Sequence, residues 1–149
     1  MISSTSHPLV LTPGHLTIEQ LKLIHQNQQF IALQDGCRPA IRKSQLLVEA
    51  YANGDDPVYG VNTGFGKLAN QRINKAQLQT LQLNLIRSHS VGVGEPLSAP
   101  IIRLMMATKA ASLARGHSGV RDIVIDTLLA VHNAGLIPDV PSQIGRAHV

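Results

Sequence analysis

One tyrosine stands directly before a glycine-rich segment in the string VYGVNTGFGKLAN, residues 58–70, here called the glycine loop. A phenol titrates near 10, so Tyr59 could act as a base only where nearby donors or cations favour its anion. Gly60, Gly64 and Gly66 would let backbone N–H groups come close to such an anion. The residues alone leave two interpretations open: a loop that presents Tyr59 to a ligand, or a structural connection with a tyrosine in the core.

The same glycines could instead bind the phosphates of a nucleotide, but their spacing argues against it. Gly60 and Gly66 enclose five residues rather than the four of a P-loop, and Leu68 stands where a serine or threonine would hold magnesium. The string GFGKLA, residues 64–69, fits a loose dinucleotide pattern. However, no acidic residue follows at about 20 residues to bind a ribose hydroxyl. We therefore expect no nucleotide at this loop.

Histidine is the other residue type that could do chemistry, and the chain has seven. Their spacing forms no metal-ligand pattern, so we expect no metal site. His89 differs from the rest because it follows Ser88 at the end of a helical pattern, just before SVGVGEP, residues 90–96. Its imidazole could bind a ligand or cap the helix end. We expect five other histidines to be solvent-facing or capping residues: His7, His15, His25, His117 and His132.

Helix signals dominate the segments that must position these residues. Thr17 and Gln20 fit a capping box, Asn74 precedes leucines that recur with helical spacing, and Ser118 opens a pattern that Gly135 ends. The sequence predicts helices over about residues 17–26, 39–53, 74–89, 98–115 and 118–134, and a short strand within residues 29–34. The fold is therefore expected to be mainly α, with at most a short strand pair. In the last helix these side chains should face inward: Val120, Ile123, Val124, Leu128 and Val131.

The composition restricts the class of protein. A length of 149 residues suits one domain, and apolar residues at 44% allow a packed core. The net charge of +4 comes from scattered basic residues without a basic run, so we expect no nucleic-acid binding. Because there is no membrane-length apolar run and no signal-peptide pattern, and Cys37 is the lone cysteine, we expect a cytoplasmic protein without membrane association.

Three strings together resemble a known enzyme family: YGVNTGFGKLA, NLIRSHSVGVGEPL and RLMMATKAASLARGHSG. They are similar to the N-terminal part of the aromatic amino acid lyases, and within that family to the bacterial histidine ammonia-lyases. The resemblance covers residues 8–143. It implies a helical lyase fold and the elimination of ammonia from L-histidine to give urocanate, in histidine degradation.

The resemblance also implies roles for individual residues. In this family an internal Ala-Ser-Gly cyclises into the electrophile 4-methylidene-imidazol-5-one, and the enzymes are homotetramers. Tyr59 matches the catalytic tyrosine, commonly assigned as the base, and the glycine loop matches a mobile lid over the substrate. Ser88 and His89 match the position that selects the substrate. A histidine there suits an imidazole substrate, which needs a hydrogen-bond partner. The implied lid residues are Gly60, Asn62, Thr63, Gly64, Phe65 and Gly66.

The chain departs from this family pattern near its end. No Ala-Ser-Gly occurs in the 149 residues, and IGRAHV, residues 144–149, follows VPSQ without a turn or cap signal. The same six letters are encoded by one reading frame of a common sequencing adapter. We therefore expect residues 1–143 to be the N-terminal part of a longer lyase, residues 144–149 to be non-native, and the chain by itself to be inactive.

Two alternatives to the histidine-specific function stay open. A tyrosine or phenylalanine ammonia-lyase or aminomutase of the same family would share the loop and differ in substrate. A non-catalytic helical interaction module is the alternative from another class of protein. Activity of the full-length protein toward the three amino acids tests the first alternative, and salt-dependent binding of the isolated chain to duplex DNA would favour the second.

Overall fold

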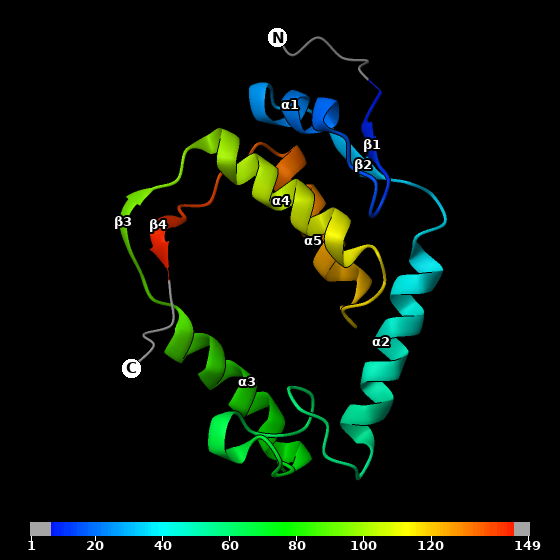
Figure 1. The fold of residues 1–149 in the computed structure, drawn as a ribbon, viewed down its shortest axis with the longest axis vertical. Coiled ribbons are helices and arrows are strands. Elements are labelled where there is room, and N and C mark those ends of the chain that lie inside the picture. Colours follow the sequence, from blue (N-terminus) through cyan, green and yellow to red (C-terminus); the bar gives the residue numbers. More distant parts are fainter. Residues whose placement is uncertain (1–6, 145–149) are drawn as a thin grey trace. The chain divides into compact units, whose positions relative to one another are not determined.

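The computed structural model describes residues 7–144. Within them the predicted mainly α fold is confirmed, with five α-helices, one 3-10 helix and four short strands (Figure 1). The described residues form two compact units, residues 7–45 with 96–140 and residues 46–95 with 141–144. The elements in chain order are β1 (Leu9–Leu11), α1 (Ile18–Gln26), β2 (Ile31–Leu33), α2 (Arg38–Asn53), the 3-10 helix (Gly66–Leu68), α3 (Lys75–His89), β3 (Gly92–Pro96), α4 (Ala99–Leu113), α5 (Asp122–Asn133) and β4 (Pro141–Ile144).

The predicted capping box at the start of α1 is confirmed. The backbone N–H of Gln20 donates to the Thr17 hydroxyl at 3.2 Å, and the N–H of Thr17 donates to Oε1 of Gln20 at 3.0 Å. The amide nitrogen of Gln20 also donates to the carbonyl of Val10 at 3.1 Å. This side chain therefore both caps α1 and links it to β1.

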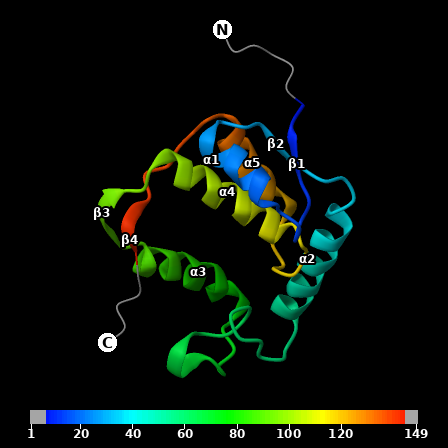
Figure 2. The same cartoon turned by 45° about the horizontal axis from the view of Figure 1, so that its top comes forward.

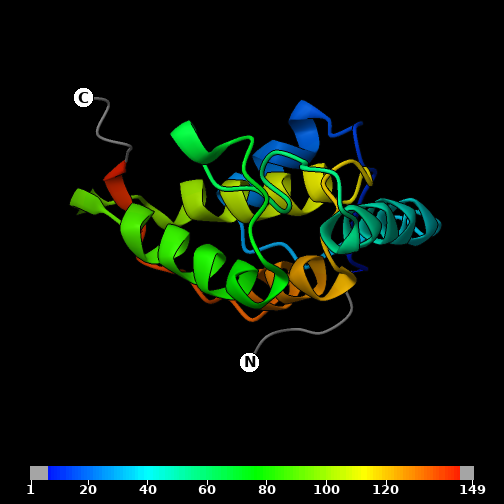
Figure 3. The same cartoon turned by 90° about the horizontal axis from the view of Figure 1, so that it is seen from below.

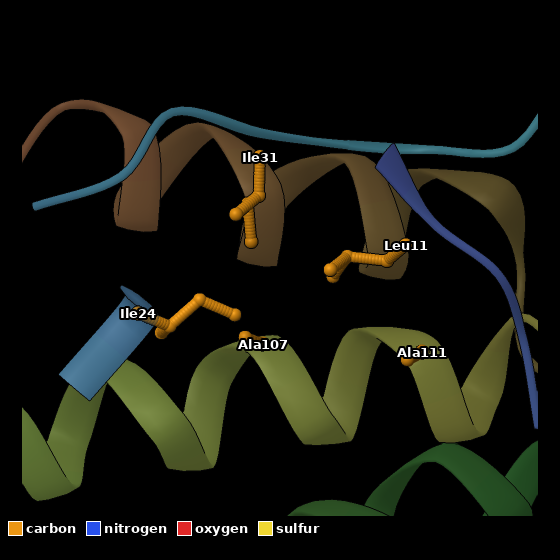
Figure 4. Close-up of a cluster of buried hydrophobic side chains, with 5 residues drawn as sticks. All are labelled: Leu11, Ile24, Ile31, Ala107 and Ala111. Carbon is orange, nitrogen blue, oxygen red and sulfur yellow. The ribbon is translucent and has the colours of Figure 1, made fainter. Parts of the chain in front are cut away.

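One of the two core clusters of the first unit lies between α4 and the segments that precede α2. Strands β1 and β2 pair in parallel, and α1 packs against α4 (Figure 2). Figure 4 shows the side chains of Leu11, Ile24 and Ile31 converging on the face of α4 that carries Ala107 and Ala111. All five residues are buried. The small alanine side chains let these branched side chains pack closely on the helix.

A second cluster joins α4 to α5 and the start of α2. Its buried members are Ile41, Ala110, Leu113, Ala114 and Ile125. Helices α4 and α5 lie side by side in this unit (Figure 1). Helix α4 begins after Ser98, as predicted, and the chain leaves it through a left-handed glycine at position 116.

The predicted start of the last helix is wrong. Helix α5 begins at Asp122 and not near Ser118, because Gly119 has a φ of +65° and its N–H donates to the Ser44 hydroxyl at 2.8 Å. The predicted inward face is also partly wrong. Ile125 is buried, whereas Ile123 and Val124 are exposed.

Charged side chains hold the beginnings of α2 and α5 together. Arg42 donates to Asp122 at 2.7 Å, and Arg38 donates to both Asp122, at 3.2 Å, and Asp126. The hydrogen bond from Arg42, with that from Arg38, lowers the pKa of the Asp122 carboxyl. These pairs are partly exposed, so their contribution to stability is small.

His132 is buried, which corrects the prediction that it faces solvent or caps a helix. Its exposed fraction is 1%, and Nε2 lies 3.0 Å from the carbonyl oxygen of Gln29. Burial lowers the pKa of this imidazole, and the nearby charge of Arg103 acts in the same direction. The next residue, Asn133, exchanges two hydrogen bonds of 2.9 Å with the backbone of Ile31. Together these bonds attach the last turn of α5 to residues 29–31, where β2 begins.

The second unit contains the end of α2, the glycine loop, α3 and the second strand pair. Residues 46–53 of this unit form the second half of α2, and residues 75–89 form α3 (Figure 3). The segment SVGVGEP ends α3 as predicted, and it adds β3, which lies beside β4 (Figure 1). Ile144 ends β4, and the rest of the predicted non-native segment lies outside the described residues. No described helix is long and apolar enough to cross a membrane.

Candidate active site

The glycine loop has a buried part and an exposed part. Asn62 and Thr63 are each 1% exposed and Gly64 is also buried, whereas the side chain of Tyr59 is 63% exposed. The core interpretation of Tyr59 is therefore wrong within this chain. The phenol is presented at the surface of a loop whose centre is packed.

The glycines serve the backbone conformation of the loop. Gly60 and Gly66 have φ values of +75° and +60°, which L-residues rarely adopt. A Cβ added at either position would meet nothing within 4 Å. The two glycines are thus required for the turns and not for a close neighbour among the described residues.

Hydrogen bonds close the loop on itself. The N–H of Gly64 donates to the carbonyl of Gln71 at 3.2 Å, and Thr63 forms an isolated antiparallel bridge with Arg72. The guanidinium of Arg72 donates to the carbonyl of Gly54 at 2.9 Å and pairs with Asp55 at 3.1 Å. These contacts connect the two ends of the loop, so its shape is set by the fold of the second unit.

An aromatic pair lies on the loop. The rings of Tyr59 and Phe65 meet edge to face, with centroids 5.8 Å apart and planes at 72°. Such a contact favours one orientation of the phenol ring. Phe65, predicted as a lid residue, therefore lies directly against the candidate base.

Ser88 and His89 lie in the last turn of α3, as predicted from the sequence, and both are exposed. The Ser88 hydroxyl donates to the carbonyl of Leu85 at 3.1 Å. Nδ1 of His89 lies 2.9 Å from the same carbonyl oxygen and 3.0 Å from the Ser88 hydroxyl oxygen. A proton on Nδ1 satisfies this carbonyl and leaves Nε2 as an exposed acceptor. The imidazole can then accept a hydrogen bond from a donor such as a ring N–H.

Tyr59 and the Ser88–His89 pair occupy the same unit on separate elements. Among the described residues no group of three or more histidine, cysteine or carboxylate side chains could hold a metal ion. What these residues can offer is a phenol for proton transfer and an imidazole for hydrogen bonding.

Comparison with known proteins identifies the family. The sequence model described as aromatic amino acid lyase matches residues 16–145. The chain belongs to the aromatic amino acid lyase family. A curated relative, the histidine ammonia-lyase of Aromatoleum aromaticum, is 51% identical over 133 residues, which are 89% of this chain and 25% of the relative.

Two solved structures of lyase-family proteins show the same fold. Tyrosine aminomutase from Streptomyces globisporus has a TM-score of 0.84 at 30% identity, over 93% of this chain and 26% of that one. Histidine ammonia-lyase from Trypanosoma cruzi has a TM-score of 0.79 at 38% identity, over 90% of this chain and 26% of that one. The chain thus spans about a quarter of the length of the curated relatives it matches.

The sequence did not reveal which residues hold the glycine loop in its conformation. Asn62 was expected only as one of the lid residues, but its side chain bonds to three backbone groups. Arg72 was not expected to take part at all. The signal for Asn62 was present, because asparagine in a turn often bonds to nearby backbone. Nothing local marks Arg72, whose partners precede it by 17 and 18 residues.

Proposed function

We propose that the full-length protein is a histidine ammonia-lyase, which eliminates ammonia from L-histidine to give urocanate. The observation that supports this most is the 51% identity to a histidine ammonia-lyase, combined with an exposed Tyr59 on a packed loop. The Ser88–His89 pair supports histidine as the substrate, since an exposed Nε2 acceptor suits an imidazole N–H. We further propose a cytoplasmic homotetramer, which sedimentation of the purified protein would test.

In this proposal Tyr59 takes the β-proton of the substrate. Its phenol is solvent-exposed in this chain and so is accessible to a substrate. Closure of the glycine loop would then exclude water from the developing charge.

The prosthetic electrophile 4-methylidene-imidazol-5-one is part of this proposal and activates the substrate when present. The 149 residues contain no Ala-Ser-Gly from which it could form. The residues of this chain therefore do not provide the group.

The role of Tyr59 is tested by Tyr59→Phe in the full-length enzyme. Phenylalanine keeps the edge-to-face contact with Phe65, and the lost hydroxyl belongs to an exposed side chain, so the stability should change by less than about 0.5 kcal/mol. Turnover of L-histidine should fall by about 100- to 10,000-fold, because the base is gone. Tyr51→Phe makes the same chemical change in the other tyrosine and should leave turnover unchanged. Near-normal turnover of the Tyr59 variant would refute the assignment.

A second candidate is a tyrosine or phenylalanine lyase or aminomutase, which the similarity to a tyrosine aminomutase favours. The two candidates are distinguished by measuring kcat/KM of the full-length protein for L-histidine, L-tyrosine and L-phenylalanine. In the histidine enzyme, His89→Leu should reduce activity on histidine and raise it on tyrosine or phenylalanine, because leucine offers an apolar surface in place of a polar acceptor. His25→Leu, which removes an exposed histidine in α1, is the control. Unchanged selectivity would show that His89 does not select the substrate and only caps the end of α3.

A further inference from the structure

Asn62 is a buried asparagine three residues after Tyr59, in the loop that we propose carries the catalytic base. We infer that Asn62 is a positioning residue, which fixes the backbone on both sides of Tyr59 through hydrogen bonds of its side chain and its main chain. This inference rests on the proposed function, because it gives Asn62 a part in the same reaction.

The side chain of Asn62 is occupied by the protein itself. Its amide nitrogen donates to the carbonyl oxygens of Tyr51 and Asp56, each at 2.9 Å, and Oδ1 accepts from the N–H of Val58 at 2.7 Å. These bonds use both donors and the acceptor oxygen of the amide. Because the residue is only 1% exposed, Asn62 acts on the loop and not directly on a substrate.

The bond to Val58 is the one that reaches Tyr59. Val58 is bonded at both backbone groups, since its carbonyl also accepts from the N–H groups of Val61, at 3.0 Å, and of Asn62, at 3.2 Å. Residues 58–62 therefore form a closed turn, and Gly60 provides its left-handed backbone at +75°. Tyr59 lies within this turn, with its phenol extending outward.

The remaining bonds of Asn62 attach the turn to the flanking helices. Tyr51 belongs to the last turn of α2, and the carbonyl of Asn62 accepts from the N–H of Ile73 at 2.8 Å, just before α3. One residue thus connects the end of α2, the turn and the entry to α3. The buried part of the glycine loop is therefore held by hydrogen bonds on both of its sides.

Loss of the Asn62 side chain would remove this partner from the N–H of Val58 and the carbonyl of Asp56, whereas the carbonyl of Tyr51 would still accept from the N–H of Gly54 at 3.2 Å. Of these groups, the N–H of Val58 is the one next to Tyr59, and an opening of the turn that lets water reach it would displace Tyr59. A displacement on the order of 1 Å at a reacting group costs about 100-fold in rate. The substrate affinity should change much less, because Asn62 does not contact the substrate.

The experiment compares Asn62→Ala, Asn62→Asp and a matched control in the full-length enzyme. Asn62→Asp keeps an acceptor for Val58 but places a carboxylate against two carbonyl oxygens, so it should be at least as damaging as alanine. Asn53→Ala is the control, because it removes a single exposed bond of 2.8 Å to the carbonyl of Glu49. The readouts are kcat and KM for L-histidine, the melting temperature, and hydrogen exchange at the amides of residues 58 and 73.

We expect kcat to fall about 10- to 100-fold in both Asn62 variants, with KM within about 3-fold of normal and the control unchanged. Exchange at Val58 should become faster while the helices keep their protection. Normal turnover in Asn62→Ala would overturn the inference. A Val58 amide that exchanges freely in the unsubstituted enzyme would overturn it without any variant. If that enzyme does not act on L-histidine, the proposed function fails, and the exchange data still decide whether Asn62 holds the turn.

Discussion

Gly116 lies where α4 ends against the start of α2, and replacing it by alanine should destabilise the first unit strongly. The glycine has a φ of +76°, and a Cβ there would lie 2.6 Å from the carbonyl carbon of Ala40 and 2.8 Å from its Cβ and oxygen. The left-handed backbone alone costs an L-residue about 1–2 kcal/mol. The overlap with backbone atoms that cannot rotate away adds about 1–3 kcal/mol. The expected total is about 2–5 kcal/mol, a large part of a typical stability of about 5–15 kcal/mol.

Gly36→Ala is the matched control for this prediction. Gly36 has a similar φ of +87°, but a Cβ there would meet nothing within 4 Å. The control should therefore lose only the backbone part, about 1–2 kcal/mol. The difference between the two variants, measured as the free energy of unfolding from denaturant curves of the full-length protein, isolates the close approach to Ala40. Equal losses in the two variants would refute the packing argument.

Two further predictions concern pH and the chain by itself. Because burial lowers the pKa of His132, the unfolded state takes up this proton first, so the free energy of unfolding should fall as the pH drops below about 6.5. In His132→Gln the midpoint of denaturant unfolding should fall less between about pH 8 and pH 5 than in the unsubstituted protein. In the control His25→Gln, which changes an exposed histidine, the midpoint should fall as much as in the unsubstituted protein. The isolated 149-residue chain should form no urocanate and show no cooperative monomeric melt, because it lacks Ala-Ser-Gly and leaves side chains such as Leu46 and Ile86 64% exposed. Urocanate above background, or a cooperative monomeric melt, would contradict this second prediction.

The sequence by itself determined the features that depend on a few neighbouring residues. The capping box of Thr17 and Gln20 and the cap at Asn74 are both present, because each is formed by groups within three residues of one another. The glycine stop at Gly135 is also present, with the left-handed φ of +71° that ends a helix. The family strings likewise identified a lyase, and the family model confirms that membership.

The tertiary structure alone decided the features whose partners are distant in the chain. Helix α5 starts late because Ser44 captures the N–H of Gly119, and His132 is buried because the segment after α1 covers it. Strands β3 and β4 pair across more than 40 residues, so no local pattern predicts them. Asn62 holds its loop through a carbonyl of α2 for the same reason. Propensity and spacing describe each segment separately, whereas burial and hydrogen-bond partners are known only when the segments have packed together.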